Sequence, residues 1–182
     1  MPPRDPQHDA LHGRGSVRLA ALPSGRPAAF DLAPDAEARA ALAERLSLLR
    51  LPKLRFAGTL QPEGREDWRL TGTLGATVVQ ACSVTLEPVT TRIDATVERR
   101  YLSGWSEPEA GTETEMPEDD TAEPLPERLD LAEVMAEALA LALPEYPRAP
   151  EAAFDGRTAA PPGAAPVTEE ETKPFASLAA LR

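Results

Sequence analysis

Side chains that could do chemistry are few in this chain and stand far apart. Cys82 is the only cysteine, so it can form neither an intrachain disulfide nor a zinc-binding thiolate cluster. Both histidines, His8 and His12, lie near the N-terminus. Because most serine and cysteine nucleophiles use a histidine as general base, a catalytic triad is not expected. These residues favour a non-enzymatic protein without a bound cofactor or metal.

Cys82 follows a run of apolar residues, and two interpretations of its thiol stay open. It can be a small buried hydrophobic side chain, or it can be a reactive thiol. The nearest glycine pair, Gly72 and Gly75, lies inside a strand-like pattern. Such glycines predict a bulge or a close backbone approach, and they do not form a phosphate-binding loop.

Carboxylates concentrate in one stretch of the chain. Residues 107–137 contain twelve of the 30 acidic residues and one of the 19 basic ones, so this stretch accounts for the net charge of −11. Acid–base catalysis or Mg²⁺ binding by Glu118, Asp119 and Asp120 would need a rigid cleft, whereas self-repulsion favours an extended chain. The stretch also repels phosphate, so we expect no contact with nucleic acid there. It is either a solvated spacer or a surface for a basic partner protein.

Alternation of apolar and polar residues predicts the strands that make up the body. It runs over residues 54–60, 68–78 and 89–101, and a shorter run covers residues 16–21. The opposite face of the long runs is charged or rich in threonine, which is typical of an antiparallel sheet with one covered face. We predict an α+β domain with an antiparallel sheet of about four to six strands and two packed helices.

The two helices are predicted from caps and breakers. The first begins after the cap Asp35 and carries Leu42, Leu46 and Leu49 on one face before Pro52 ends it. A second helix begins after a cap at position 130, where a glutamate three residues later completes a capping box, and a proline at position 144 ends it. Apolar residues on nearly every side predict that this second helix is buried.

Composition divides the chain into segments. They are a disordered arm at 1–15, the α+β domain at 16–147 with a flexible acidic insertion at 104–128, a disordered linker at 148–172, and a short C-terminal motif at 173–182. No stretch approaches the roughly 20 apolar residues of a membrane span. The first residues also lack the apolar core of a signal peptide. We therefore expect a cytoplasmic protein.

The C-terminal motif places Phe175, Leu178 and Leu181 on one face of a possible short helix. An isolated helix of this length is marginal in water. The segment can fray, dock onto its own domain, or bind a groove on a partner.

Three segments stand in order along the chain: residues 78–89 with Cys82, Leu86, Glu87 and Pro88, residues 129–144 with Asp130, Leu143 and Pro144, and residues 173–178. Taken together they resemble hallmarks of the YceD-type family, the large ribosomal RNA subunit accumulation proteins. The family commonly has Cys-x-x-Cys before Leu-Glu-Pro, and Thr85 stands here at the second cysteine position. In this the chain resembles an alphaproteobacterial branch, and the departure argues against metal or redox chemistry.

The resemblance implies a non-enzymatic factor in biogenesis of the large ribosomal subunit, which supports accumulation or processing of 23S ribosomal RNA. Its implied partners are ribosomal proteins or a large-subunit precursor, and direct contact with RNA stays open. The alternative is a small acidic adaptor or regulatory module that binds a non-ribosomal protein through its C-terminal amphipathic segment.

Overall fold

A computed structural model describes part of the chain. The described residues are 11, 13, 15–22, 25–105 and 121–153. The chain divides into a unit of residues 1–149, which contains every element below, and a unit of residues 150–182. The predicted C-terminal motif with Phe175, Leu178 and Leu181, and the acidic residues Glu118, Asp119 and Asp120, lie outside the described residues.

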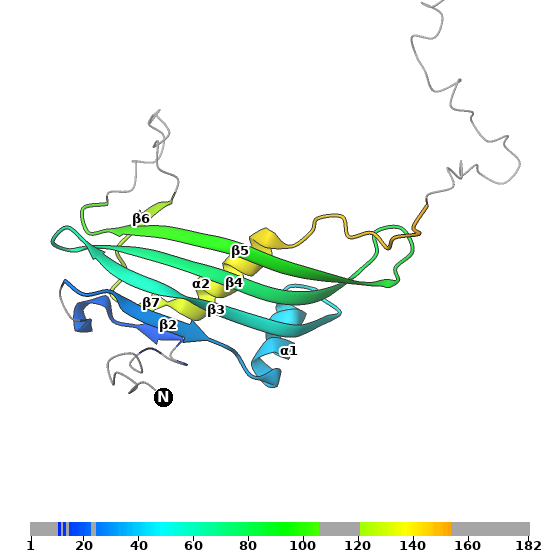
Figure 1. Cartoon of the computed structure of the whole chain (residues 1–182), viewed down its shortest axis with the longest axis horizontal. Coiled ribbons are helices and arrows are strands. Elements are labelled where there is room, and N and C mark those ends of the chain that lie inside the picture. The colour runs from blue at the N-terminus through cyan, green and yellow to red at the C-terminus, as the bar shows by residue number, and fades with distance from the viewer. Residues whose placement is uncertain (1–10, 12, 14, 23–24, 106–120, 154–182) are drawn as a thin grey trace, which may run out of the picture. The chain divides into compact units, whose positions relative to one another are not determined.

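Five strands form the main sheet in the order β2-β3-β4-β5-β6 (Figure 1). They are β2 (Ala28–Leu32), β3 (Arg50–Glu63), β4 (Asp67–Ala81), β5 (Pro88–Leu102) and β6 (Ala122–Pro124). Neighbours from β2 to β5 are antiparallel, and only the short edge strand β6 runs parallel to its neighbour. The predicted α+β class is confirmed, and β6 lies inside the stretch 104–128 that the sequence predicted as a flexible insertion.

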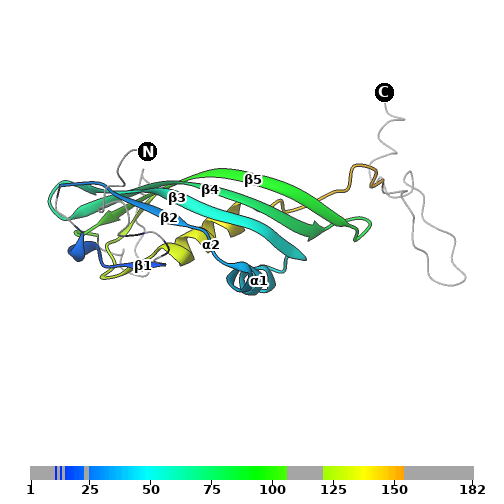
Figure 2. The same cartoon turned by 60° about the horizontal axis from the view of Figure 1, so that its bottom comes forward.

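The period-two alternation of the long strands decides which face of the sheet is covered. Most of their buried side chains point to one face, and these include Leu54, Phe56, Leu60, Leu70, Leu74, Val78, Ile93 and Val97. Both helices, α1 (Ala36–Arg45) and α2 (Leu131–Ala142), lie on this face, and no described element covers the opposite, open face (Figure 2). The predicted orientation of the long strands is confirmed.

Helix α1 begins as predicted but ends earlier. The Asp35 carboxylate accepts a hydrogen bond from the Ala38 N–H at 2.9 Å. After Arg45 the chain reverses through Ser47, which has a left-handed φ of 54°, and the Leu49 N–H donates to Val79 O at 2.8 Å. The prediction of a helix continuing to Pro52 is therefore wrong. The chain joins the sheet before that residue, and Pro52 lies in β3.

Helix α2 is capped by Asp130, whose carboxylate accepts the N–H groups of Ala132 and Glu133 at 2.9 and 3.2 Å. The Glu133 carboxylate pairs with Arg45 of α1, which lowers the pKa of Glu133 and joins the two helices. Of the predicted capping box, the Asp130 carboxylate makes the expected bonds to backbone N–H groups. The Glu133 carboxylate pairs with Arg45 of the other helix. The helix is buried on one side only, since Leu141 is 79% exposed.

The N-terminal part of the unit differs from the prediction. β1 spans only Ser16–Val17 and pairs with β7 (Leu129–Asp130), and residues Leu19–Ala21 form a 3₁₀ turn, η1. The predicted strand over residues 16–21 is therefore too long. Strand β2 was not predicted, because only two of its five residues are large and apolar.

Close packing of β2, β3 and β4 depends on two glycines. Gly58 and Gly72 are opposite each other in neighbouring strands, and the Phe30 ring from β2 packs above them, 4.9 Å from the Phe56 ring. A Cβ on Gly58 would overlap the Thr71 carbonyl and lie 2.6 Å from the Gly72 Cα. Gly72 thus marks the close approach that its place in the strand pattern predicted.

We expect Gly58→Ala to lower the free energy of unfolding by about 3 kcal/mol, because backbone atoms cannot yield to the new methyl group. Gly75→Ala is the matched control in the same sheet. Its Cβ would meet the ends of the Arg92 and Asp94 side chains and no backbone atom, so we expect a change within about 1 kcal/mol. Chemical denaturation of both variants measures the difference, and equal losses would contradict this account of the packing.

Candidate functional site at the β4–β5 turn

Two segments that are about sixty residues apart meet at the turn between β4 and β5. The Gln80 side-chain amide donates to Pro144 O at 3.2 Å, and the Ser83 N–H donates to Pro147 O at 2.8 Å. In Figure 1 the segment after α2 runs toward this turn. The structure thereby brings Cys82, Leu86, Glu87 and Pro88 together with Leu143 and Pro144. Asp130, the remaining motif residue, lies at the opposite end of α2 as its cap.

The turn itself is closed by short backbone hydrogen bonds. The Cys82 N–H donates to Glu87 O at 2.7 Å, and the Leu86 N–H donates back to Cys82 O at 3.0 Å. Leu86 adopts a left-handed φ of 64°, which is uncommon for a residue other than glycine. This conformation directs the side chain outward, where it is 76% exposed. Leu86 thus has both an uncommon backbone conformation and a side chain exposed to solvent.

The Cys82 thiol lies at the centre of the junction, by which we mean residues 80–88 of the turn and residues 143–149 after α2. It is buried and accepts N–H groups from Val84, Thr85 and Ala149, each at 3.4 Å. The Thr85 side chain, followed by these backbone donors, lowers the pKa of Cys82 to about 6, although burial opposes the shift. The thiol therefore joins the turn to the segment after α2, a role beyond that of a small hydrophobic side chain.

The sulfur of Cys82 is surrounded by hydrogen-bond donors. Thr85 stands beside the thiol at the position where a second cysteine would be a ligand. Within the described ranges, no three His, Cys, Asp or Glu side chains come close enough to hold a metal ion. The N–H donors around Cys82 instead satisfy its sulfur within the protein.

Exposed large hydrophobic side chains lie on segments that meet at this turn or lead into it. The described residues include four of them, which we call the turn-end surface: Leu49, Leu86, Leu141 and Tyr146. Leu49 is bonded to Val79 just before the turn, and Tyr146 lies between the two prolines that bond to β4 and the turn. Leu141 is in the last turn of α2. Clustered exposed apolar residues are typical of protein-binding surfaces.

Three of these four side chains were missed by the sequence analysis. Leu49 was assigned to the apolar face of the first helix, and Leu141 to a helix buried all round. Tyr146 could have been found, because a lone aromatic residue between Pro144 and Pro147 contributes to no periodic pattern. Leu86 was identified only as part of the motif.

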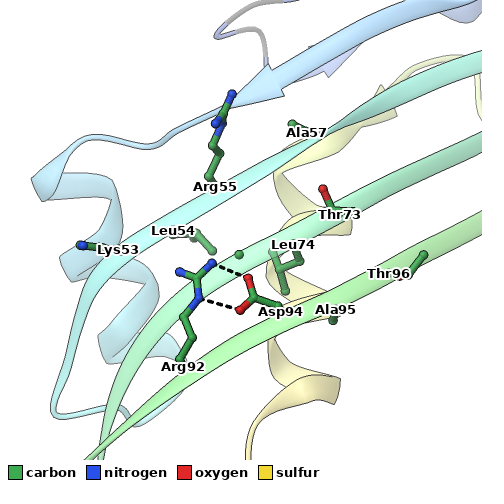
Figure 3. A pocket seen from close by; sticks show the side chains of 11 residues that line it. Lys53, Leu54, Arg55, Ala57, Thr73, Leu74, Arg92, Asp94, Ala95 and Thr96 are labelled. Carbon is green, nitrogen blue, oxygen red and sulfur yellow. Dashed lines mark hydrogen bonds and ion pairs between the residues drawn. The ribbon is translucent and has the colours of Figure 1, made fainter.

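A second candidate is a hollow of about 600 Å³ on the open face of the sheet (Figure 3). The Arg92 guanidinium lies over Gly75, and its Nε donates to Asp94 Oδ2 at 2.8 Å. Arg92 lowers the pKa of Asp94, the one carboxylate that lines the hollow. Asp94 thus stays ionised and paired, so it is poorly suited to act as a general acid or base.

The fold defines a small α+β protein whose main sheet is covered by two helices on one face. Residues 70–182 match the family model described as large ribosomal RNA subunit accumulation protein YceD. The match covers more than half of the chain, so the chain belongs to this family. It includes β4 from Leu70 onward, β5, α2 and the two segments that meet at the β4–β5 turn. No curated protein and no solved structure matches the chain. None of the helices among the described residues has the length and hydrophobicity needed to span a membrane.

The lowered pKa of Cys82 predicts a pH-dependent stability. The folded protein loses the thiol proton near pH 6, whereas the ordinary thiol pKa is about 9.0. Between these values the unfolded chain binds more protons, so the contribution of Cys82 to stability is complete above pH 9 and is lost as the pH falls toward 6. We expect the difference in unfolding midpoint between wild type and Cys82→Ala to widen as pH rises through this window.

Urea denaturation at several pH values measures this difference, and the ultraviolet absorbance of the thiolate reports the titration directly. Cys82→Ser is a useful control, since its hydroxyl keeps an acceptor but does not titrate in this range. A difference between wild type and Cys82→Ala that stays constant with pH would contradict the prediction.

Proposed function

We propose that this protein is a non-enzymatic factor in biogenesis of the large ribosomal subunit, and that it supports accumulation or processing of 23S ribosomal RNA by holding a protein partner. The family description supports the ribosomal role. The proposal depends most on one observation: the four exposed large hydrophobic side chains of the described part lie on segments that meet at the β4–β5 turn or lead into it. Such a role places the protein in the cytoplasm, where bacterial ribosomes assemble.

The chemistry of the turn-end surface favours a protein as the partner. Interface cores are enriched in aromatic and large apolar side chains, and a few such residues carry most of the binding energy. Leu86 and Tyr146, at 76% and 75% exposure, are the best candidates for these anchors. Both are placed by hydrogen-bonded segments of the junction, so little conformational freedom is lost when a partner binds.

Acidic charge supports a basic partner such as a ribosomal protein. Residues 107–120 contain seven carboxylates and no basic residue. The carboxylates at positions 123, 127, 130, 133 and 137 are engaged within the unit: Arg99, Arg18 and Arg45 pair with four of them, and the fifth caps α2. The seven between 107 and 120 are therefore the charges proposed to attract a basic protein over a distance.

Action by binding is also supported by the state of the carboxylates. Each described carboxylate with a resolved pKa shift has a lowered pKa: Glu63, Asp67, Asp94 and Glu133. The main cause is an arginine partner, or Ser103 in the case of Asp67. A general acid at neutral pH needs a raised pKa, so these groups are suited to ion pairing.

The double variant Leu86→Ser with Tyr146→Ser tests the role of the turn-end surface. Because both side chains are exposed, we expect the melting temperature to stay close to wild type while partner affinity falls about tenfold or more. Affinity purification followed by protein and RNA identification measures the partner, and the level of mature 23S RNA measures the function. Arg65→Ser with Glu66→Ser, at the β3–β4 turn, is the matched control.

Two outcomes would count against the proposal. One is unchanged recovery of ribosomal proteins or precursors with the double variant at the turn-end surface. The other is normal large-subunit precursors and normal 23S RNA in a strain that lacks the protein.

The alternative is a small acidic adaptor that binds a non-ribosomal protein through Phe175, Leu178 and Leu181, which lie outside the described residues. Replacing Phe175 and Leu178 by Ala should abolish partner binding and barely change the melting temperature if this segment docks onto a partner. A large loss of stability would show that the segment packs on its own domain. Purification that recovers one enzyme and no ribosomal component would favour the adaptor.

A further inference from the structure

The outer edge of β5 presents backbone groups that have no backbone partner among the described residues. The Arg100 N–H donates to Thr121 O at 2.9 Å and the Leu125 N–H donates to Leu102 O at 3.1 Å, so these two residues direct their backbone groups away from β4. Every second residue of a strand directs its N–H and C=O to the same side. The backbone groups facing this outer edge therefore also include those of Thr90, Arg92, Asp94, Thr96 and Glu98.

No strand within the described residues pairs with this part of the edge. β6 pairs with β5 only at Arg100–Leu102, and no backbone hydrogen bond among the described residues involves the outward groups of Thr90, Arg92, Asp94, Thr96 and Glu98. Five N–H and five C=O groups thus form a regular row on a long strand. Such an edge is a ready template for pairing with another strand.

The sequence of β5 is complementary to itself when read in the antiparallel direction. A register centred on Ala95 sets Arg92 opposite Glu98 of a second copy, and Ile93 opposite Val97. A register centred on Ile93 sets Arg92 opposite Asp94. In both registers, oppositely charged side chains face each other across the two β5 strands. Each such pair occurs twice, because the two-fold axis repeats it.

Neighbouring registers are unfavourable. Centring the pair on Asp94 would set that carboxylate opposite itself, and centring it on Thr96 would set Arg92 opposite Arg100. Like charges directly opposite each other destabilise a strand pair, so the charged side chains select the register and exclude unrelated strands. This pattern of charges favours a second copy of the chain over an arbitrary peptide.

We propose that β5 pairs antiparallel with β5 of a second copy, which joins the two main sheets into one continuous sheet across a two-fold axis. In the register centred on Ala95, residues 92, 94, 96 and 98 of each copy form four hydrogen-bonded pairs. The covered faces of the two sheets become continuous through Ile93, Ala95 and Val97. The inference does not rest on the proposed ribosomal function.

Sedimentation of the full chain over a range of concentrations tests the proposal. Wild type should pass from monomer to dimer, and a protein that stays monomeric up to about 100 µM would overturn the proposal. Thr96→Pro removes one outward N–H and is tolerated on an edge strand, so it should remain monomeric with little change in melting temperature.

Amide hydrogen exchange gives a readout that does not depend on a variant folding. The N–H groups of Arg92, Asp94, Thr96 and Glu98 should become protected as the concentration rises. The N–H groups of Ile93, Ala95 and Val97 face β4 and should be protected at every concentration. Equal behaviour of the two sets would overturn strand pairing at this edge.

Charge variants test the register. Arg92→Glu should weaken the dimer about tenfold, since it sets like charges opposite each other at two places. Arg55→Glu is the matched control, because Arg55 forms a similar two-point ion pair with Asp31 away from the edge, and it should leave the dimer unchanged. Restoring the dimer with Arg92→Glu plus Glu98→Arg, or plus Asp94→Arg, supports the corresponding register. Failure of both exchanges would overturn the charge-complementary pairing.

Discussion

The side-chain alternation of β4 is the constraint on which the rest of the structure depends. This central strand pairs along almost its whole length with β3 on one side and β5 on the other. Its buried residues Leu70, Leu74, Ala76 and Val78 face the helices. The register in which β3 and β5 pair with β4 therefore places the apolar side chains of all three strands on the same face. The helices then have one surface on which to bury their apolar sides, and the open face is left to threonine and charged residues.

The turn between the long strands β4 and β5 lies at the end of the sheet. It is stabilised there by hydrogen bonds of its own. The buried thiol of Cys82 contributes to them by accepting N–H groups from the turn and from the segment that follows α2. A left-handed Leu86 and an exposed Tyr146 are held in place by this junction. Exposed hydrophobic side chains on a well-ordered turn suit binding, since an ordered surface loses less entropy when a partner arrives.

The carboxylates of the acidic stretch 107–137 fall into two groups: some form ion pairs within the fold, and others are proposed to attract a partner. Glu123 and Glu137 pair with Arg99, which is mostly buried and holds β6 and α2 to β5. Glu133 joins α2 to α1 through Arg45. Part of what looks in the sequence like a uniform excess of negative charge is therefore used inside the fold, and the carboxylates at 107–120 are the ones proposed to act on a partner.

The amino-acid sequence by itself determined the features that arise from local patterns. Period-two alternation defined the long strands and their covered face, and the caps Asp35 and Asp130 follow from the need of the first helical N–H groups for an acceptor. Motif residues at the β4–β5 turn were likewise recognisable from their order along the chain. In each case the physical cause lies within a few residues of its effect.

Only the tertiary structure decided the rest. The end of α1 depends on the bond from Leu49 to Val79, and β2 depends on the space that Gly58 and Gly72 leave for the Phe30 ring. The bonds that join residues 144–149 to the turn involve partners far away in sequence. The edge of β5 likewise became visible only when no strand of the described residues was found beside it. A hydrogen-bond partner about sixty residues away leaves no period in the sequence, so these features appear only once the chain has folded.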